Sequence, residues 1–267
     1  MLIDRFINSA SKKPDKNGTN KKCFLFKDYA LLYGFFKEER LNQIIQISSE
    51  LKDKGVFILP TLEYKVDIPS DKLGKSKGFL LQQRAEGEEL YHRGMSAPEY
   101  RKRLKEIAQL DHHKLDKFID DWLSITASGL RVDPSRCENF FYLNGKISFV
   151  DLNLQRRPVS FKRCFFEICR ILTGLELKSK YKTNGDDLPK IITKVSSSFL
   201  KRGLELAEIQ EVISMYSYFM DKQQIDSIIC RLGKEKKSIK FSKILTEHSA
   251  NNKGMRIKKS TKQENAR

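Results

Sequence analysis

The sequence lacks the marks of several large protein classes. No apolar run approaches 18 residues, so none predicts a membrane-spanning helix, and the chain does not start with the basic-then-apolar order of a signal peptide. Five cysteines are scattered without a Cys-x-x-Cys pair, and no histidine or cysteine spacing is typical of zinc. An odd number of scattered cysteines favours reduced thiols. We therefore expect a protein of a cytosol-like compartment.

Acidic residues are outnumbered in this chain. It has 51 Lys and Arg against 34 Asp and Glu, a net charge of +17, and residues 233–267 alone carry 11 Lys or Arg against 3 Glu. Such a surplus favours a polyanionic partner: nucleic acid, a phosphoinositide-bearing membrane or an acidic protein. We interpret residues 233–267 as a basic flexible tail. Residues 1–21 show no apolar periodicity and predict a flexible leader.

The most informative stretch runs from Gly129 to Leu154. Two short apolar runs, residues 139–142 and 146–150, lie on either side of the sequence Leu143-Asn144-Gly145. An Asn-Gly pair between two such runs is the strongest short-range signal for a tight β-hairpin. We therefore predict a two-stranded hairpin in the middle of the chain.

Three oxygen-bearing side chains stand at the ends of this predicted hairpin. Asp133 and Asn139 come just before its first strand, and Asp151 ends its second strand. Because a hairpin brings its entry and exit close together, we expect these side chains to converge. Carboxylate and amide oxygens suit Mg²⁺, which proteins usually hold with one or two carboxylates and substrate phosphates. The alternative is an ordinary turn at Asp133 and a strand end at Asp151.

The elements on either side of this stretch follow a recognisable order. Apolar runs and periodicity predict two strands, a helix and three more strands in the first part of the chain. From there on, apart from the hairpin, they predict only helices. The predicted strands before the hairpin are 23–26, 29–34, 56–59, 62–66 and 78–84. The predicted helices are 37–54, 97–110, 113–127, 161–173, 187–202, 206–218 and 222–232.

This order, with Asp133, Asn139 and Asp151, resembles the protein-kinase-like fold. The resemblance implies an α+β, bilobal architecture, with a β-rich lobe at 22–85 that has one main helix, and a helical lobe at 86–232. It implies Asp133 as the catalytic Asp, and Asn139 and Asp151 as ligands of Mg²⁺. Three details depart from the family pattern. Arg131-Val132 replaces His-Arg, six residues rather than five separate Asp133 from Asn139, and Asp-Leu-Asn replaces Asp-Phe-Gly.

The same resemblance implies where ATP binds. Residues 84–90 resemble the hinge between kinase lobes, which places Arg84 and Glu86 beside the nucleotide. The strand at 29–34 lacks the usual phosphate-binding Lys, and no Gly-x-Gly-x-x-Gly precedes it. Lys27 and Lys37, on either side of this strand, are the candidates for the missing Lys, with Lys37 preferred. Glu50, near the end of the following helix, is the preferred partner and Glu39, near its start, the other; the alternative is plain surface charge for each.

Several functions remain open at this stage. The leading hypothesis is an ATP- and Mg²⁺-dependent phosphotransferase whose acceptor, protein or small molecule, is unknown. The alternatives are a catalytically silent kinase-like scaffold that binds a partner, and a basic nucleic-acid-binding protein that stacks bases on the aromatic residues of 161–165. Only residues 153–160 separate Asp151 from the next predicted helix. In this short link the chain resembles aminoglycoside-phosphotransferase-like enzymes and compact bacterial effector kinases. We therefore expect a cytoplasmic location, and the alternative is delivery into a host cell as an effector.

Overall fold

The computed structural model divides the chain into two compact units, Met1–Thr183 and Asn184–Arg267. The structure describes most of the first unit and the helical part of the second. The described residues are 2–10, 14–17, 21–59, 61–71, 74–92, 94–136, 139–174 and 187–239. The predicted lobe boundary at residue 85 stays a prediction, because both expected lobes begin inside the first unit.

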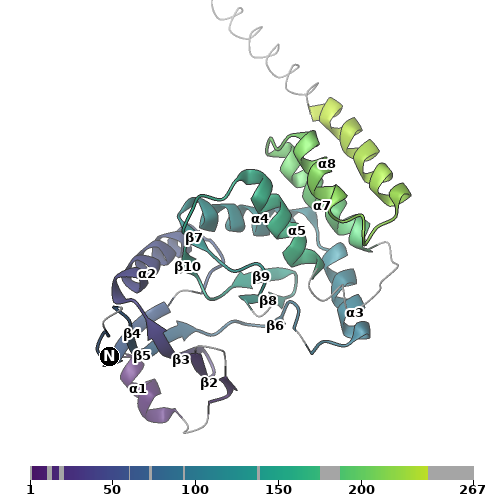
Figure 1. Ribbon diagram of the computed structural model, residues 1–267. Helices are drawn as coiled ribbons and strands as arrows, with labels where there is room; N and C mark the ends of the chain where they lie inside the picture. The colour runs from purple at the N-terminus through teal and green to yellow at the C-terminus, as the bar shows by residue number, and fades with distance from the viewer. Residues whose placement is uncertain are drawn as a thin grey trace, which may run out of the picture. The chain divides into compact units, whose positions relative to one another are not determined.

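A five-stranded antiparallel sheet opens the first unit (Figure 1). Its spatial order is β1-β2-β3-β5-β4, and one helix, α2 (Glu38–Asp53), connects β3 to the edge strand β4. Apolar residues recur along α2 at three- and four-residue spacing, which is why it forms an amphipathic helix. The strands are β1 (Lys16–Asn17), β2 (Lys21–Leu25), β3 (Tyr29–Phe36), β4 (Thr61–Ile68) and β5 (Ser76–Gln83). The predicted order of strands 23–26 and 29–34, helix 37–54 and strands 62–66 and 78–84 is confirmed.

One part of the predicted leader is a helix. α1 (Leu2–Ser9) packs on the sheet, and its Ile3 is fully buried in a cluster with Phe24, Leu31 and Leu81. The Lys65 ammonium lies 2.6 Å from the Asp4 carboxylate and ties α1 to β4. The sequence prediction missed this helix because eight residues are too few for periodicity to stand out. A helix of eight residues is marginal on its own, so α1 is stabilised by its burial against the sheet.

Three helices form the rest of the framework of the first unit. They are α3 (Ala97–Ala108), α4 (His112–Ala127) and α5 (Phe161–Thr173). Each begins after a residue whose side-chain oxygen accepts a hydrogen bond from the backbone amide three residues on, namely Ser96, Asp111 and Ser160. Such N-caps satisfy an amide that the helix itself leaves unpaired. The predicted helices 97–110, 113–127 and 161–173 are therefore confirmed to within two residues.

The predicted hairpin is present as β8 (Phe140–Leu143) and β9 (Lys146–Phe149). Asn144 and Gly145 between them have φ angles of 51° and 82°, the left-handed pair that a type I′ turn requires. Phe140 and Phe149 are buried, and Trp122 of α4 lies against both rings. The hairpin is thus anchored in the core, and β6 (Glu88–Glu89) extends it on one side.

A separate two-stranded ladder positions the segments on either side of the hairpin. β7 (Leu130–Arg131) pairs antiparallel with β10 (Asn153–Leu154). This pairing fixes the chain two residues before Asp133 and two residues after Asp151. The ladder therefore holds both predicted site segments at one place.

The second unit is helical in its described part. It contains α7 (Asp187–Lys201), α8 (Leu206–Ser214) and a further helix over residues 222–239. The Ser197 hydroxyl donates to Glu235, and the Lys236 ammonium lies 2.6 Å from Glu205, so the last helix is tied to the other two. Residues 233–239 of the predicted tail continue this helix, and the remainder of that tail lies outside the described residues. No described helix of the chain is long and apolar enough to cross a membrane.

Candidate active site

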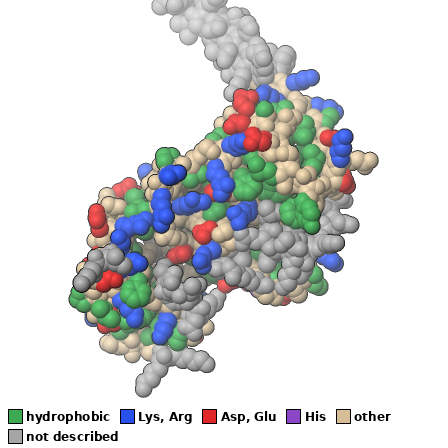
Figure 2. Space-filling model, viewed as in Figure 1, with side chains coloured by type: hydrophobic (Ala, Val, Ile, Leu, Met, Phe, Trp, Pro, Cys, Tyr) green, Lys and Arg blue, Asp and Glu red, His purple; other side chains and the backbone are tan. Residues whose placement is uncertain are grey.

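A large cavity of about 1190 Å³ lies within the first unit. It is bordered by β3 and β5 on one side, by the connection at residues 84–89, and by the segments at both ends of the hairpin. We call it the main cavity. On the face drawn in Figure 2, Lys and Arg side chains form a band beside acidic side chains in a hollow. A volume of this size exceeds the roughly 300–1,000 Å³ typical of small-molecule sites.

Asp133 lines the main cavity and is held by its own turn. The Ser135 hydroxyl and amide both donate to its Oδ1, at 2.7 and 2.9 Å, and Arg136 Nε lies 3.7 Å from Oδ2. Partial burial alone raises the pKa of Asp133. The hydrogen bonds from Ser135 and the charges of Arg136 and Arg131 outweigh that burial, so the pKa lies below its ordinary value. Asp133 is therefore a carboxylate at neutral pH.

Asn139 and Asp151 line the same cavity from the two ends of the hairpin. Asn139 is 4% exposed, its Nδ2 donates to the Asp133 carbonyl at 3.4 Å, and its own carbonyl accepts from the Val150 amide at 3.0 Å. Asp151 has a left-handed backbone, with φ of 56°. Non-glycine residues rarely adopt this conformation, and Asp and Asn tolerate it best. The hairpin thus brings the three predicted side chains to one cavity.

The oxygen donors of this cavity fit Mg²⁺ bound together with phosphate. Within the described part of the chain, no group of three or more His, Cys, Asp and Glu side chains forms a complete metal site. Mg²⁺ does not need a complete set of protein ligands, because it retains coordinated waters and takes further ligands from substrate phosphates. The Asp151 carboxylate and the Asn139 amide, which line one wall, are the donors suited to it.

The connection between the sheet and α3 forms another wall of the main cavity. Arg84 lines it, and its Nη1 donates to the Phe26 carbonyl at 2.9 Å. Ala85, Gly87 and Glu88 line it as well, whereas Glu86 is exposed and does not. The segment predicted to lie beside the nucleotide, residues 84–90, therefore reaches the main cavity. Of its two predicted side chains, Arg84 lines the cavity and Glu86 does not.

Gly87 is required by the close approach of this connection to the hairpin. Its φ is 86°, and a Cβ built there would lie 2.3 Å from the Tyr142 carbonyl oxygen. Glu88 and Glu89 pair with Tyr142 and Phe141 immediately afterwards. Any larger residue at 87 must therefore displace the backbone of β8.

We expect Gly87→Ala to lower the free energy of unfolding by about 3 kcal/mol, because it adds a backbone clash to the left-handed penalty of about 1–2 kcal/mol. Urea unfolding measures it. Gly55→Ala is the matched control, because Gly55 has φ of 78° and nothing within 4 Å of the added Cβ. Equal losses for the two variants would contradict the close approach.

The candidates for the missing Lys–Glu pair are separated by the length of α2. Lys37 lines a second cavity of about 230 Å³, which we call the small cavity, together with Asp151. Glu50 is exposed near the other end of the helix, accepts a hydrogen bond from Gln46, and lines neither cavity. The β3 residue that lines both cavities is Leu32. The structure therefore brings Lys37, but not Glu50, towards the site.

A buried carboxylate below Asp133 was not predicted from the sequence. Glu167 of α5 is 1% exposed, and it lies 3.0 Å from Arg131 Nη2 and 2.9 Å from Arg163 Nε. Arg131 belongs to β7, two residues before Asp133. The pair thus fastens the Asp133 segment to α5. The spacing of 36 residues between Glu167 and Arg131 leaves no local signal of this contact.

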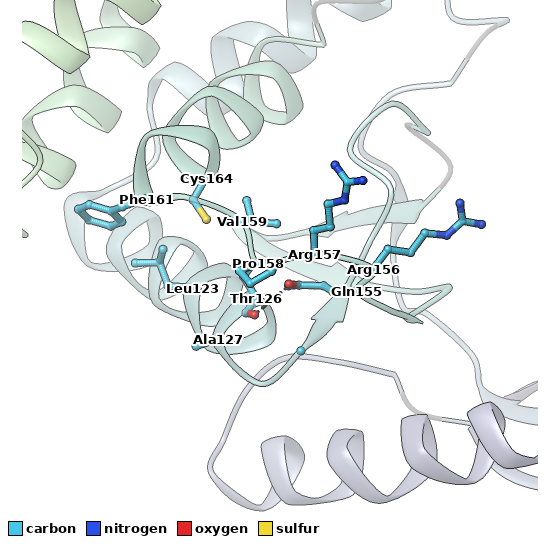
Figure 3. A pocket seen from close by; sticks show the side chains of 11 residues that line it. Leu123, Thr126, Ala127, Gln155, Arg156, Arg157, Pro158, Val159, Phe161 and Cys164 are labelled. Atoms are coloured by element: carbon cyan, nitrogen blue, oxygen red, sulfur yellow. Dashed lines mark hydrogen bonds between the residues drawn. The ribbon is translucent and has the colours of Figure 1, made fainter.

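A third cavity, of about 560 Å³, lies beside the short link after Asp151 (Figure 3). The Gln155 Nε2 donates to the carbonyls of Thr126 and Leu130, at 2.8 and 2.6 Å, which fixes the link against the end of α4. Arg156 and Arg157 extend away from the apolar side of the cavity, where Phe161 lies. The link reaches α5 directly, so no long activation segment is present between β10 and that helix.

Comparison with known proteins gives likenesses of fold only. No protein-family model and no curated protein matches the sequence. The chain is similar to WaaP in complex with acyl carrier protein, at 14% identity and a TM-score of 0.46, over 87% of this chain and 91% of that one. It is also similar to the LegK7 effector kinase of Legionella pneumophila, at 11% identity and a TM-score of 0.45, over 88% and 66%. An aminoglycoside phosphotransferase from Alicyclobacillus acidocaldarius matches at 8% identity and a TM-score of 0.36, over 86% and 96%.

The order of the elements and the site together define the class of this protein. A five-stranded antiparallel sheet with one helix is followed by a connecting segment, helices and a hairpin that carries Asn139 and Asp151 at its ends. This is the α+β, protein-kinase-like fold that the sequence predicted.

Proposed function

We propose that this protein is an ATP- and Mg²⁺-dependent phosphotransferase. The observation that carries the proposal is that Asp133, Asn139 and Asp151 line one cavity together with the segment at residues 84–89. The cavity offers apolar surface from Ala30, Leu32 and Val150 and oxygen donors in the same space. A nucleotide needs both, because its base is apolar on its faces and its phosphates are anionic.

Each side chain has a role that its geometry supports. Asp133 is held as a carboxylate by Ser135, which donates to its Oδ1. Its Oδ2, which lies 3.7 Å from Arg136 Nε, would accept a hydrogen bond from an acceptor hydroxyl and so orient the attacking oxygen. Asp151 and Asn139 would hold Mg²⁺, which supplies neutralisation of phosphate charge when bound. Phosphoryl transfer depends mainly on positioning and electrostatic stabilisation, and these three groups are of the kind that such a reaction uses.

A catalytically silent scaffold is the second candidate. It is favoured by Leu32, which lies at the cavity where a phosphate-binding Lys is expected. Such a protein would keep the fold and bind a partner without transferring phosphate. The nucleic-acid alternative is weakened, because Phe165 is fully buried in α5 and cannot stack on a base. A cytoplasmic location, in its own cell or in a host cell, remains part of the proposal.

Thermal unfolding of the full chain with and without ATP and MgCl₂ tests the proposed function. A ligand that binds only the folded protein stabilises it by about 2.7 kcal/mol at a hundredfold excess over its Kd. We expect ATP with MgCl₂ to raise Tm, and EDTA to remove most of that rise. No shift with ATP at any magnesium concentration would contradict nucleotide binding. A shift without phosphate transfer to any acceptor, including water, would favour the silent scaffold.

A further inference from the structure

Among the described residues, the main cavity has no cation at the strand position where the protein-kinase-like fold usually carries a lysine. Leu32 of β3 lies at the border of the main and small cavities. The α2 side chains that line the small cavity beside it are Leu41 and Ile44, so an apolar pair stands in place of an ion pair. ATP carries about four negative charges, and Mg²⁺ offsets only two of them. A nucleotide site here needs a cation from another element.

Among the described residues, three arginines and one lysine line the main cavity, and the three arginines are already engaged. Arg84 donates to the Phe26 carbonyl, and Arg136 lies 3.7 Å from Asp133. Arg103 lies 2.8 Å from Glu88 and 3.1 Å from Glu106. Lys102 of α3 lines the main cavity, but neither it nor any of the three arginines lines the small cavity, which Asp151 also lines.

The small cavity supplies two cations next to Asp151. Lys37 and Arg40 line it, and they stand at three-residue spacing at the start of α2, on the same face as Leu41 and Ile44. Both side chains are exposed, and neither forms an ion pair with a carboxylate among the residues that the structure places. They are thus free to take an anionic ligand.

The small and main cavities adjoin beside Asp151. They share four lining residues: Leu32, Gln82, Asp151 and Asn153. A nucleotide whose base lies in the main cavity and whose phosphates reach Asp151 would therefore extend its terminal phosphates into the small cavity.

We infer that the small cavity is the phosphate subsite of the nucleotide, with Arg40 as its main cation and Lys37 as a second one. This inference rests on the proposed function. The guanidinium group of Arg40 presents two parallel N–H donors, which match two phosphate oxygens, and it stays charged at any physiological pH. In this chain the phosphate-binding cations would therefore belong to the helix α2, whereas the protein-kinase-like fold usually has a lysine on the strand that corresponds to β3.

Isothermal titration of the full chain with MgATP and with adenosine tests the subsite. We expect Arg40→Ala to raise the Kd for MgATP at least tenfold and to leave the Kd for adenosine unchanged, because adenosine has no phosphate. Arg40→Lys should recover part of the loss, and Lys37→Ala should cost less than Arg40→Ala. Arg101→Ala is the matched control, since Arg101 is exposed on α3 and lines none of the three cavities.

The outcomes separate this inference from the proposed function. If the wild-type protein does not bind MgATP, the proposed function fails and the inference fails with it. If the wild-type protein binds MgATP and Arg40→Ala binds it equally well, only the inference is overturned. A loss of adenosine and MgATP binding by the same factor would also overturn it, because that pattern reports a general change of the cavity. Unchanged Tm of each variant without ligand shows that the fold is intact.

Discussion

Asp151→Asn is expected to abolish the magnesium-dependent stabilisation of this protein by ATP. The substitution keeps the size of the side chain and the tolerance for a left-handed backbone, which Asp151 needs at its φ of 56°. It removes the one carboxylate that, among the described residues, lines both the main and the small cavity. We expect affinity for MgATP to fall at least about 100-fold, or ~2.8 kcal/mol at 1.4 kcal/mol per tenfold change. Thermal unfolding over a series of ATP concentrations, with and without MgCl₂, measures this loss.

A matched substitution controls for the general effect of lost charge. Asp226 is exposed on the helix over 222–239 and lines none of the cavities. Asp226→Asn should therefore leave the shift with MgATP unchanged. A full magnesium-dependent shift in Asp151→Asn would show that the metal is held elsewhere, and the assignment of Asp151 would be wrong.

Removal of both arginines around Glu167 is expected to destabilise the protein strongly. Arg131→Ala combined with Arg163→Ala leaves a carboxylate that is 1% exposed without either of the cations within 3.0 Å of it. Breaking a buried pair in this way commonly costs about 3–5 kcal/mol, because the remaining charge is desolvated and uncompensated. Since whole domains are stable by only about 5–15 kcal/mol, the loss should be visible as a large shift of the urea midpoint.

A third substitution distinguishes the buried charge from a simple loss of packing. Adding Glu167→Met to the double variant removes the carboxylate and keeps the volume, and we expect it to recover most of the lost stability. Arg101→Ala with Lys105→Ala, two exposed cations of α3, should change stability by less than about 1 kcal/mol in total. If the triple variant is no more stable than the double variant, the unpaired Glu167 charge is not the cause of the lost stability, and the role given to the two ion pairs is wrong.

Local patterns predicted most elements of this fold. The apolar spacing in α2, α4 and α5 gave their positions, and the Asn144-Gly145 pair gave the hairpin, because only residues that accept positive φ fit a type I′ turn. The same hairpin led to the prediction that Asp133, Asn139 and Asp151 converge. These signals are local, because helices and tight turns depend on residues a few positions apart.

The contacts that sequence patterns missed all join distant segments. Ile3 is buried with Leu31 and Leu81, although α1 is too short to be recognised alone. Glu167 meets Arg131 across 36 residues, and Gly87 meets the Tyr142 carbonyl from another strand. No spacing rule predicts such contacts, because they depend on how complete elements pack.

The sequence by itself determined the α+β order of the elements, the turn of the hairpin and the identity of its three oxygen-bearing side chains. Only the tertiary structure decided which charged side chains line the same cavities. It placed Leu32 at the border of both cavities, Glu50 away from both, and Arg40 in the small cavity that Asp151 also lines. The reason is physical: a helix fixes which residues share a face, but the packing of α2 against the sheet fixes where that face points.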